Sequence, residues 1–410
     1  MSSLSLALAL SCGVSSSPGS EFPIGSRSDS VLERWVERAL HANPEAKAVR
    51  WSVAAAIAQE QGARSWMPPT TQVQYQSDGK IDLALSQMVP GFGKTAAQAE
   101  VRSLRTAMVR LDSADRIRKL SLAVREAAWM EWMAWQKVSV LAGQDSAWTR
   151  LSEALQRTQA QGMTSASETW IVRAKASQSK ADLAKADAEA VAATAMRESW
   201  TGLEHVRMRP DVAVPPDWDS AGLLKVAEDR SDIRTMAADA AMQRAMAGSM
   251  RNSLRPDFMV GAMAMRMTDG MPGWGVMAGM TLPFVPWARG MALSEANGSD
   301  AAARETESKV QGMRRMARSE VQRHSRKAFA AWKALRETDS LVLPGLQQAV
   351  MDLRLRYAQG REMLSMVLAM EDMVRMTRMQ SIMLRGEYEL ERVRLLAATG
   401  DGIQPKRGVQ

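Results

Sequence analysis

Methionine is the residue type in this sequence with the most distinctive chemistry. The chain carries 31 methionines among 410 residues. Met263, Met265 and Met267 occupy alternate positions, and alternate side chains of a β-strand point to the same face. Thioether sulfur is a ligand for soft ions such as Cu(I) and Ag(I). These three residues are therefore candidate metal contacts, although methionine also serves as a generic apolar filler, and both interpretations stay open.

Cys12 is the only cysteine of the chain, so no intrachain disulfide can form. It directly follows the apolar residues 4–11, which is how the end of a lipoprotein signal peptide looks. A Gly- and Ser-rich stretch with the composition of a flexible tether follows it. We therefore expect residues 1–29 to be a signal-like segment and linker with Cys12 as its lipidation site. A plain secretory signal and an inert thiol are the alternatives.

Catalytic and cofactor chemistry find no support in the residue patterns. His41, His205 and His324 are scattered, and none has a second His or Cys at the spacing of metal ligands. The sequence has neither a phosphate-binding loop nor a nucleophile elbow. The net charge of +8 comes from Lys and Arg that alternate with acidic residues along helical stretches, which indicates a solvated surface rather than a nucleic-acid interface. We expect no enzyme, no cofactor and no nucleic-acid partner.

The elements that would position the methionine strand follow from periodicity. Residues 30–42 and 45–65 show helical spacing and are separated by Asn43-Pro44. Residues 70–89 then alternate apolar and polar around Ser77-Asp78-Gly79, which predicts a β-hairpin with one apolar face. From Thr95 to about Gln161 nothing breaks the helical pattern, so a helix about 100 Å long follows. Such a helix indicates a coiled coil, a bundle or a tunnel wall.

The whole arrangement is then repeated along the chain. Residues 43–69 align without gaps on residues 230–256, and a second hairpin is expected, with strands near residues 257–267 and 274–284. A second long helical region runs from about Met291 to Gln359. The sequence thus predicts a mainly α fold with a small β part and a duplicated helix–hairpin–long helix order. One chain supplies only four strands, too few to close a barrel, whereas three chains would supply twelve.

In this order and spacing the chain resembles the TolC-like outer-membrane efflux family. The resemblance extends over about residues 30 to 402. It rests on Asn43-Pro44, on Pro69 and Pro256 before the strands, on residues 85–94 after the first hairpin, and on residues 354–360. It implies a homotrimer with a 12-stranded β-barrel in the outer-membrane lipid and an α-helical periplasmic tunnel. It also implies a periplasmic adaptor and an inner-membrane pump as partners. Phe92-Gly93-Lys94, at the exit of the first hairpin, is similar to the same segment in the heavy-metal efflux branch of the family.

The resemblance also places a gate near the ends of the long helices. Gly162 and Gly360 would mark the periplasmic tip turns. Acidic residues six and nine positions after each glycine form a constriction in the family, and only Glu168 is acidic among the four positions here. Glu168, Tyr357, Arg361 and Glu362 are therefore the gate candidates. A solvated helix carboxylate is the alternative for Glu168.

The predicted organisation has two repeats, residues 30–202 and 203–402, followed by a tail at 403–410. The predicted function is a passive exit duct of a tripartite efflux system that spans the outer membrane and extends into the periplasm, with heavy-metal cations as the expected cargo. The main alternative is an elongated coiled-coil scaffold or adaptor without channel activity. That alternative explains the long helices but not the paired hairpins.

Overall fold

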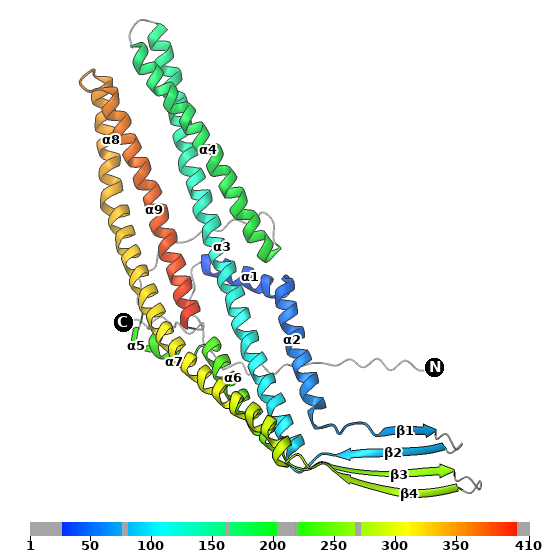
Figure 1. Cartoon of the computed structure of the whole chain (residues 1–410). Coiled ribbons are helices and arrows are strands. Elements are labelled where there is room, and N and C mark those ends of the chain that lie inside the picture. The colour runs from blue at the N-terminus through cyan, green and yellow to red at the C-terminus, as the bar shows by residue number, and fades with distance from the viewer. Residues whose placement is uncertain are drawn as a thin grey trace.

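The computed structural model shows an elongated molecule with a small β-sheet at one end and long helices extending away from it (Figure 1). The structure describes residues 27–75, 81–160, 165–202, 218, 220–266 and 272–399. Cys12, Gly162 and Met267 lie outside these residues. Among the described residues, no helix is both long enough and apolar enough to cross a membrane.

The first half of the chain follows the predicted order of elements. Asn43 ends the first helix and caps the second, because its side chain accepts a hydrogen bond from the Glu45 N–H and Pro44 fits the first helical turn. The third helix has 67 residues, which corresponds to about 100 Å. The elements are α1 (Arg27–Ala42), α2 (Pro44–Gln61), the short η1 (Gly62–Arg64), β1 (Thr70–Tyr75), β2 (Ile81–Val89), α3 (Lys94–Ala160) and α4 (Ala166–Thr201).

The second half repeats this order, which confirms the predicted duplication. Two details differ from the sequence-based prediction. β4 ends at Met280, before 284, because the chain turns around Pro283, and a five-residue π-helix interrupts the second long helix. The elements are α5 (Ser220–Ala227), α6 (Ser231–Asn252), β3 (Phe258–Arg266), β4 (Pro272–Met280), α7 (Pro286–Glu337), η2 (Thr338–Val342), α8 (Leu343–Ala358) and α9 (Leu364–Thr399).

The four strands form one antiparallel sheet in the order β1-β2-β3-β4. The two hairpins join through β2 and β3, with Met88 opposite Met259 and Ala84 opposite Met263. β1 and β4 therefore have one unpaired edge each. Unpaired strand edges favour pairing with another chain.

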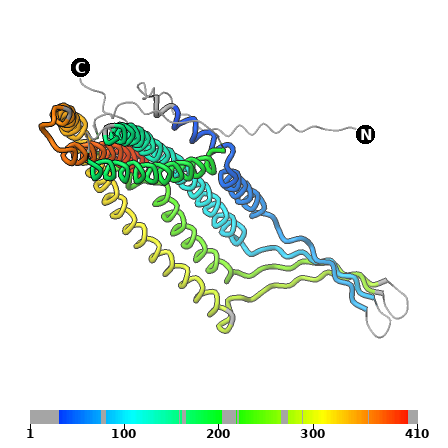
Figure 2. Tube along the Cα trace, turned by 90° about the horizontal axis from the view of Figure 1, so that it is seen from above, coloured from blue at the N-terminus to red at the C-terminus, as the bar shows by residue number. Residues whose placement is uncertain are grey.

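The helices next to the sheet keep the lateral order of the strands. α2 packs on α3, α3 on α6 and α6 on α7, and Figure 2 shows these four helices running side by side from the strands. Farther from the sheet, α4 packs on α3, α3 on α9 and α9 on α8. The free edges of the protomer are thus α2 and α4 on one side and α7 and α8 on the other.

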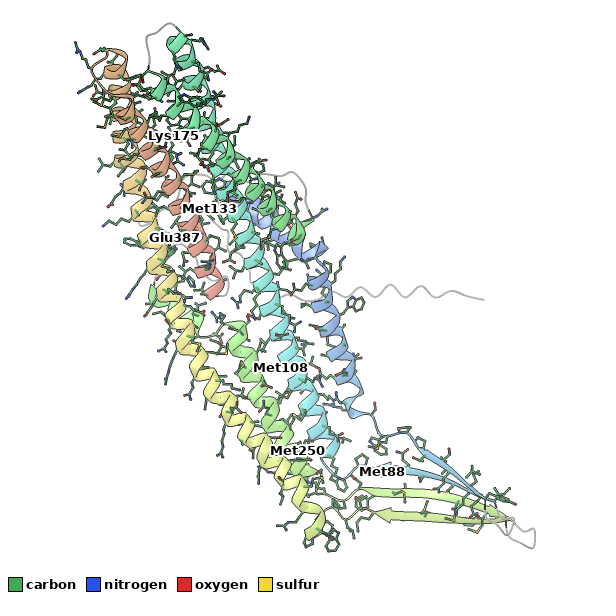
Figure 3. All side chains as sticks on the ribbon, turned by 45° about the horizontal axis from the view of Figure 1, so that its top comes forward. Met88, Met108, Met133, Lys175, Met250 and Glu387 are labelled. Carbon is green, nitrogen blue, oxygen red and sulfur yellow. The ribbon has the colours of Figure 1, made fainter. Side chains whose placement is uncertain are left out.

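The core lies midway along the molecule, where the two halves meet. Trp35 of α1, Trp129 of α3 and Val393 of α9 belong to one buried cluster. The fully buried Arg197 pairs with Glu131 at 2.5 Å and lies over the Trp35 ring. Nearby, Gly386 lets α9 approach α3, because a Cβ there would collide with Met133 (labelled in Figure 3).

Candidate functional site

The sheet has two chemically different faces. One face is apolar and strongly exposed, with Tyr75 at 72%, Trp274 at 84% and Val276 at 78% exposure. The other face carries Gln72 and Gln74 of β1 and Asp82, Ser86 and Met88 of β2, as the strand registers require. A sheet with one apolar and one polar face suits a wall between lipid and water.

Most of the strand methionines occupy the polar face, whereas Met280 lies on the apolar face opposite Phe258. Met259, Met263 and Met265 share a face with Asp82 and Gln74 through the registers of β1, β2 and β3. β4 places glycines opposite all three. A Cβ at Gly275 would lie 3.3 Å from Met263 Cγ, so the thioether chain lies against the glycine backbone. Met277 of β4 faces the same side, opposite Gly261.

A partly buried junction joins the two repeats where the strands meet the helices. Asp257, just before β3, accepts a hydrogen bond from the Gly91 N–H at 2.8 Å and pairs with Lys94 at 2.7 Å. Gly91 has no room for a Cβ, which would collide with the Pro256 carbonyl oxygen. Gly93 has φ +82°, a conformation that side chains rarely adopt. The glycines after the first hairpin thus let the chain turn tightly against residues 255–257.

At the far end, the structure brings two of the gate candidates together. Tyr357 of α8 packs against the apolar cluster of Trp148, Leu155, Val172, Leu364 and Leu368. Burial there, and the nearby Glu168 carboxylate, raise the pKa of Tyr357. Glu168 lies in the first turn of α4, where its N–H binds the capping Ser165 side chain at 3.3 Å. Tyr357 of the second hairpin therefore packs against side chains of both hairpins, and Glu168 of the first hairpin lies close enough to act on its pKa.

The other two gate candidates lie in the turn itself. Gly360 has φ +69°, and the Arg361 N–H bonds to the Arg356 carbonyl at 2.9 Å. The Glu362 carboxylate accepts from the Met363 N–H at 3.3 Å. Within the described residues, the side chains of Arg361 and Glu362 form no ion pair. These residues shape the turn that follows α8.

Sequence reasoning missed an ion pair that links the two hairpins near the tip. Lys175 of α4 pairs with Asp372 of α9 at 2.5 Å, and Lys175 lies near the tip in Figure 3. Arg375 of α9 lies 3.6 Å from the same carboxylate. Lys175 and Asp372 follow their tip glycines by almost the same number of residues. The sequence signal for this ion pair was the presence of opposite charges at nearly equivalent positions of the two repeats.

The comparisons with known proteins agree with this geometry. No protein-family model and no curated protein matches the sequence. Solved structures match over nearly the whole chain. CusC, whose structures concern folding and transmembrane channel formation, is 14% identical with a TM-score of 0.75, covering 93% of this chain and 98% of that one. The Campylobacter jejuni CmeC outer membrane channel is 13% identical with a TM-score of 0.78, covering 96% and 92%.

A third structure, the outer membrane protein VceC from Vibrio cholerae, is 15% identical with a TM-score of 0.76, covering 92% of this chain and 97% of that one. At these identities the likeness defines the fold. The chain therefore has the fold of the TolC-like outer-membrane channels, and the resemblance predicted from its sequence is confirmed at that level.

Proposed function

We propose that three copies of this chain close into an outer-membrane efflux channel, a passive exit duct for cargo delivered by a periplasmic adaptor and an inner-membrane pump. Three four-stranded sheets would form a 12-stranded barrel, and the long helices would form a periplasmic tunnel. The observation that carries the proposal is that the free edges of the sheet and the free edges of the helices lie on the same two sides of the protomer.

The free edges support head-to-tail closure of the chains. β1, α2 and α4 lie along one edge of the protomer, and β4, α7 and α8 lie along the other. Joining these edges is a heterologous contact, which forms a ring when its rotation closes. A single rotation between neighbouring copies can pair the free strand edges and the free helix edges at once, because strands and helices keep the same lateral order.

The helix edges near the tip carry complementary seams. On α4, the face away from α3 has small exposed residues in steps of three and four, namely Ala174, Ser177, Ala181, Ala184 and Ala188. On η2 and α8, Leu341, Met351 and Leu355 are large and exposed, 10 and 4 residues apart. Large residues of one helix fit the gaps that a small-residue seam leaves on another. We propose that α8 of one copy packs against α4 of the next.

The apolar face of the sheet supports a position in the membrane. Three of the four strands have nine residues each, close to the ~9–11 that a membrane-crossing strand needs. Tyr75 and Trp274 lie near the hairpin ends, whereas the exposed Phe92, Phe284 and Trp287 follow the opposite strand ends. Aromatic side chains at both ends of an apolar band are typical of membrane barrels. A scaffold in water would expose this face at a cost.

In this arrangement the polar sheet face, with Met263 and Met265, would line the lumen. We propose a soft metal cation as cargo, because thioethers on a water-filled wall can contact such an ion. Deleting the gene should sensitise cells to copper or silver more than to dyes and detergents. Sensitivity to organic compounds alone would reject the metal cargo and leave the channel in place.

We also propose Cys12 as the acylated mature N-terminus, which mass spectrometry of membrane-extracted protein would test.

Thiol labelling during conductance recordings tests the channel proposal. Met263→Cys should introduce a lumen-facing thiol, so a charged methanethiosulfonate reagent should reduce the conductance of the protein in planar bilayers. Val276→Cys, on the opposite face of the sheet, is the matched control and should be insensitive. Absence of conductance from membrane-reconstituted protein, or block of Val276→Cys alone, would reject the proposed arrangement.

A further inference from the structure

A cavity of about 850 Å³ lies between α3, α8 and α9 near the tip. α3 belongs to the first helical hairpin of the chain, and α8 and α9 belong to the second. Its length follows from Val140 and Leu151, which both line it from α3 and are about 16 Å apart along the helix axis. This volume falls within the ~300–1,000 Å³ of small-molecule sites.

The walls of the cavity are mostly apolar. α3 contributes Val140, Ala147, Trp148 and Leu151. α8 and α9 contribute, among others, Val350, Met351, Leu364, Val367, Leu368 and Val374. An elongated apolar body placed there would therefore contact mainly side chains that cannot hydrogen-bond to water.

Charged groups in the cavity are strongly biased to one sign. Four arginines line it, Arg150, Arg354, Arg375 and Arg378, against the single acidic residue Glu371. Glu371 is paired with Arg354. Arg375 lies near Asp372, and its Nε donates at 3.2 Å to the Gln144 amide oxygen, which also accepts from Trp148 Nε1. Within the described residues, Arg150 and Arg378 form no ion pair.

We propose that this cavity is a binding site for a small amphipathic anion, a carboxylate on an elongated apolar body. The apolar walls would hold the body, and Arg150 or Arg378 would bind the carboxylate through charge-assisted hydrogen bonds. The site does not rest on the channel proposal, because binding requires only the described hairpins.

The bound anion would contact both hairpins at once. Trp148 and Arg150 belong to the first hairpin, and Met351 and Arg378 belong to the second. Arg375 lines the cavity and also lies near Asp372, the partner of Lys175. Binding would therefore stabilise the present arrangement of the two hairpins beside their connecting ion pair.

Calorimetry on the full chain in lipid nanodiscs tests the site with 6-phenylhexanoate as the probe. We expect saturable binding of this acid, and none of 6-phenylhexanol or 6-phenylhexylamine at the same concentrations. The double variant Arg150→Gln/Arg378→Gln should weaken binding about tenfold. Arg157→Gln, an exposed arginine on the same helix outside the cavity, is the matched control and should bind normally.

A second variant distinguishes binding in the cavity from a general effect of removing positive charge. Ala147→Trp fills the cavity and leaves all four arginines in place, so it should also abolish binding while helical content by circular dichroism stays normal. Equal binding of the acid, alcohol and amine would overturn the proposal. Unchanged binding of the acid to either the double arginine variant or Ala147→Trp would also overturn it.

Discussion

At the scale of single residues, one carboxylate joins the two repeats beside the sheet. Asp257 bonds the Gly91 N–H and the Lys94 ammonium, both from the other repeat. Asp257→Ala should lower the free energy of unfolding by about 1–3 kcal/mol, because it leaves two partly buried donors without an acceptor. Asp257→Asn should cost less, since an amide oxygen still accepts one bond. Heat unfolding of the purified protein measures both, with the exposed Asp352→Asn as control. Equal stability of all three variants would contradict this role.

A second residue-scale prediction concerns acid stability. Asp115 is buried against Arg118 and Lys119, at 2.5 and 2.8 Å. Burial favours its neutral form, but hydrogen bonds from Lys119 and Arg118 outweigh burial and hold the pKa of Asp115 below its ordinary value. Its contribution to stability is therefore present above the unfolded pKa of about 3.9 and lost as pH falls through the lower folded pKa.

Asp115→Asn removes that titration. The variant should be less stable than the natural protein at neutral pH, and the difference should shrink as pH falls toward 3. Circular dichroism melts at a series of pH values measure it. A difference that is constant across this range would show that Asp115 is not the titrating group.

At the scale of elements, the ion pair between α4 and α9 is the candidate lock of the tip. Lys175 and Asp372 are partly exposed, so their pairing is worth about 1 kcal/mol per chain. Asp372→Asn should shift the closed-to-open ratio about fivefold toward open and raise the conductance. The charge-exchanged variant Lys175→Asp/Asp372→Lys should restore the low conductance in planar bilayers. Low conductance in Asp372→Asn would place the lock elsewhere.

Elements were also the level at which sequence reasoning worked best. Asn43-Pro44, the alternation around residues 70–89 and the unbroken run after Thr95 are local signals, and the structure follows them. The pairings between repeats were not predictable from one repeat alone. Lys175 and Asp372 are 197 residues apart, and only the packing of the hairpins brings them together. Which face of the sheet carries Met263 and Met265 became clear only from the register of β2 with β3, which places Met265 opposite Asp82.

At the scale of the whole molecule, each side of the protomer ends in one free strand and in helices that pack on a neighbour from one side only. The sheet edges are β1 and β4, and the helix edges near the tip are α4 and α8. Counting from the tip glycines, Ala174 of α4 and Gln348 of α8 are each 12 residues away. Both are exposed in the single chain, and α4 and α8 run in opposite directions relative to the tip (Figure 1). Ring closure would bring these two positions of neighbouring copies to the same height.

Disulfide cross-linking in outer membranes therefore tests the central claim most directly. In chains that carry both Ala174→Cys and Gln348→Cys, mild oxidation should give dimers and then trimers, with nothing larger. Each single variant, and the mismatched pair Ala174→Cys with Arg326→Cys, should stay monomeric on a denaturing gel. A ladder that ends at three chains is the predicted result. Monomers only, or a ladder that continues beyond three, would contradict the closed trimer.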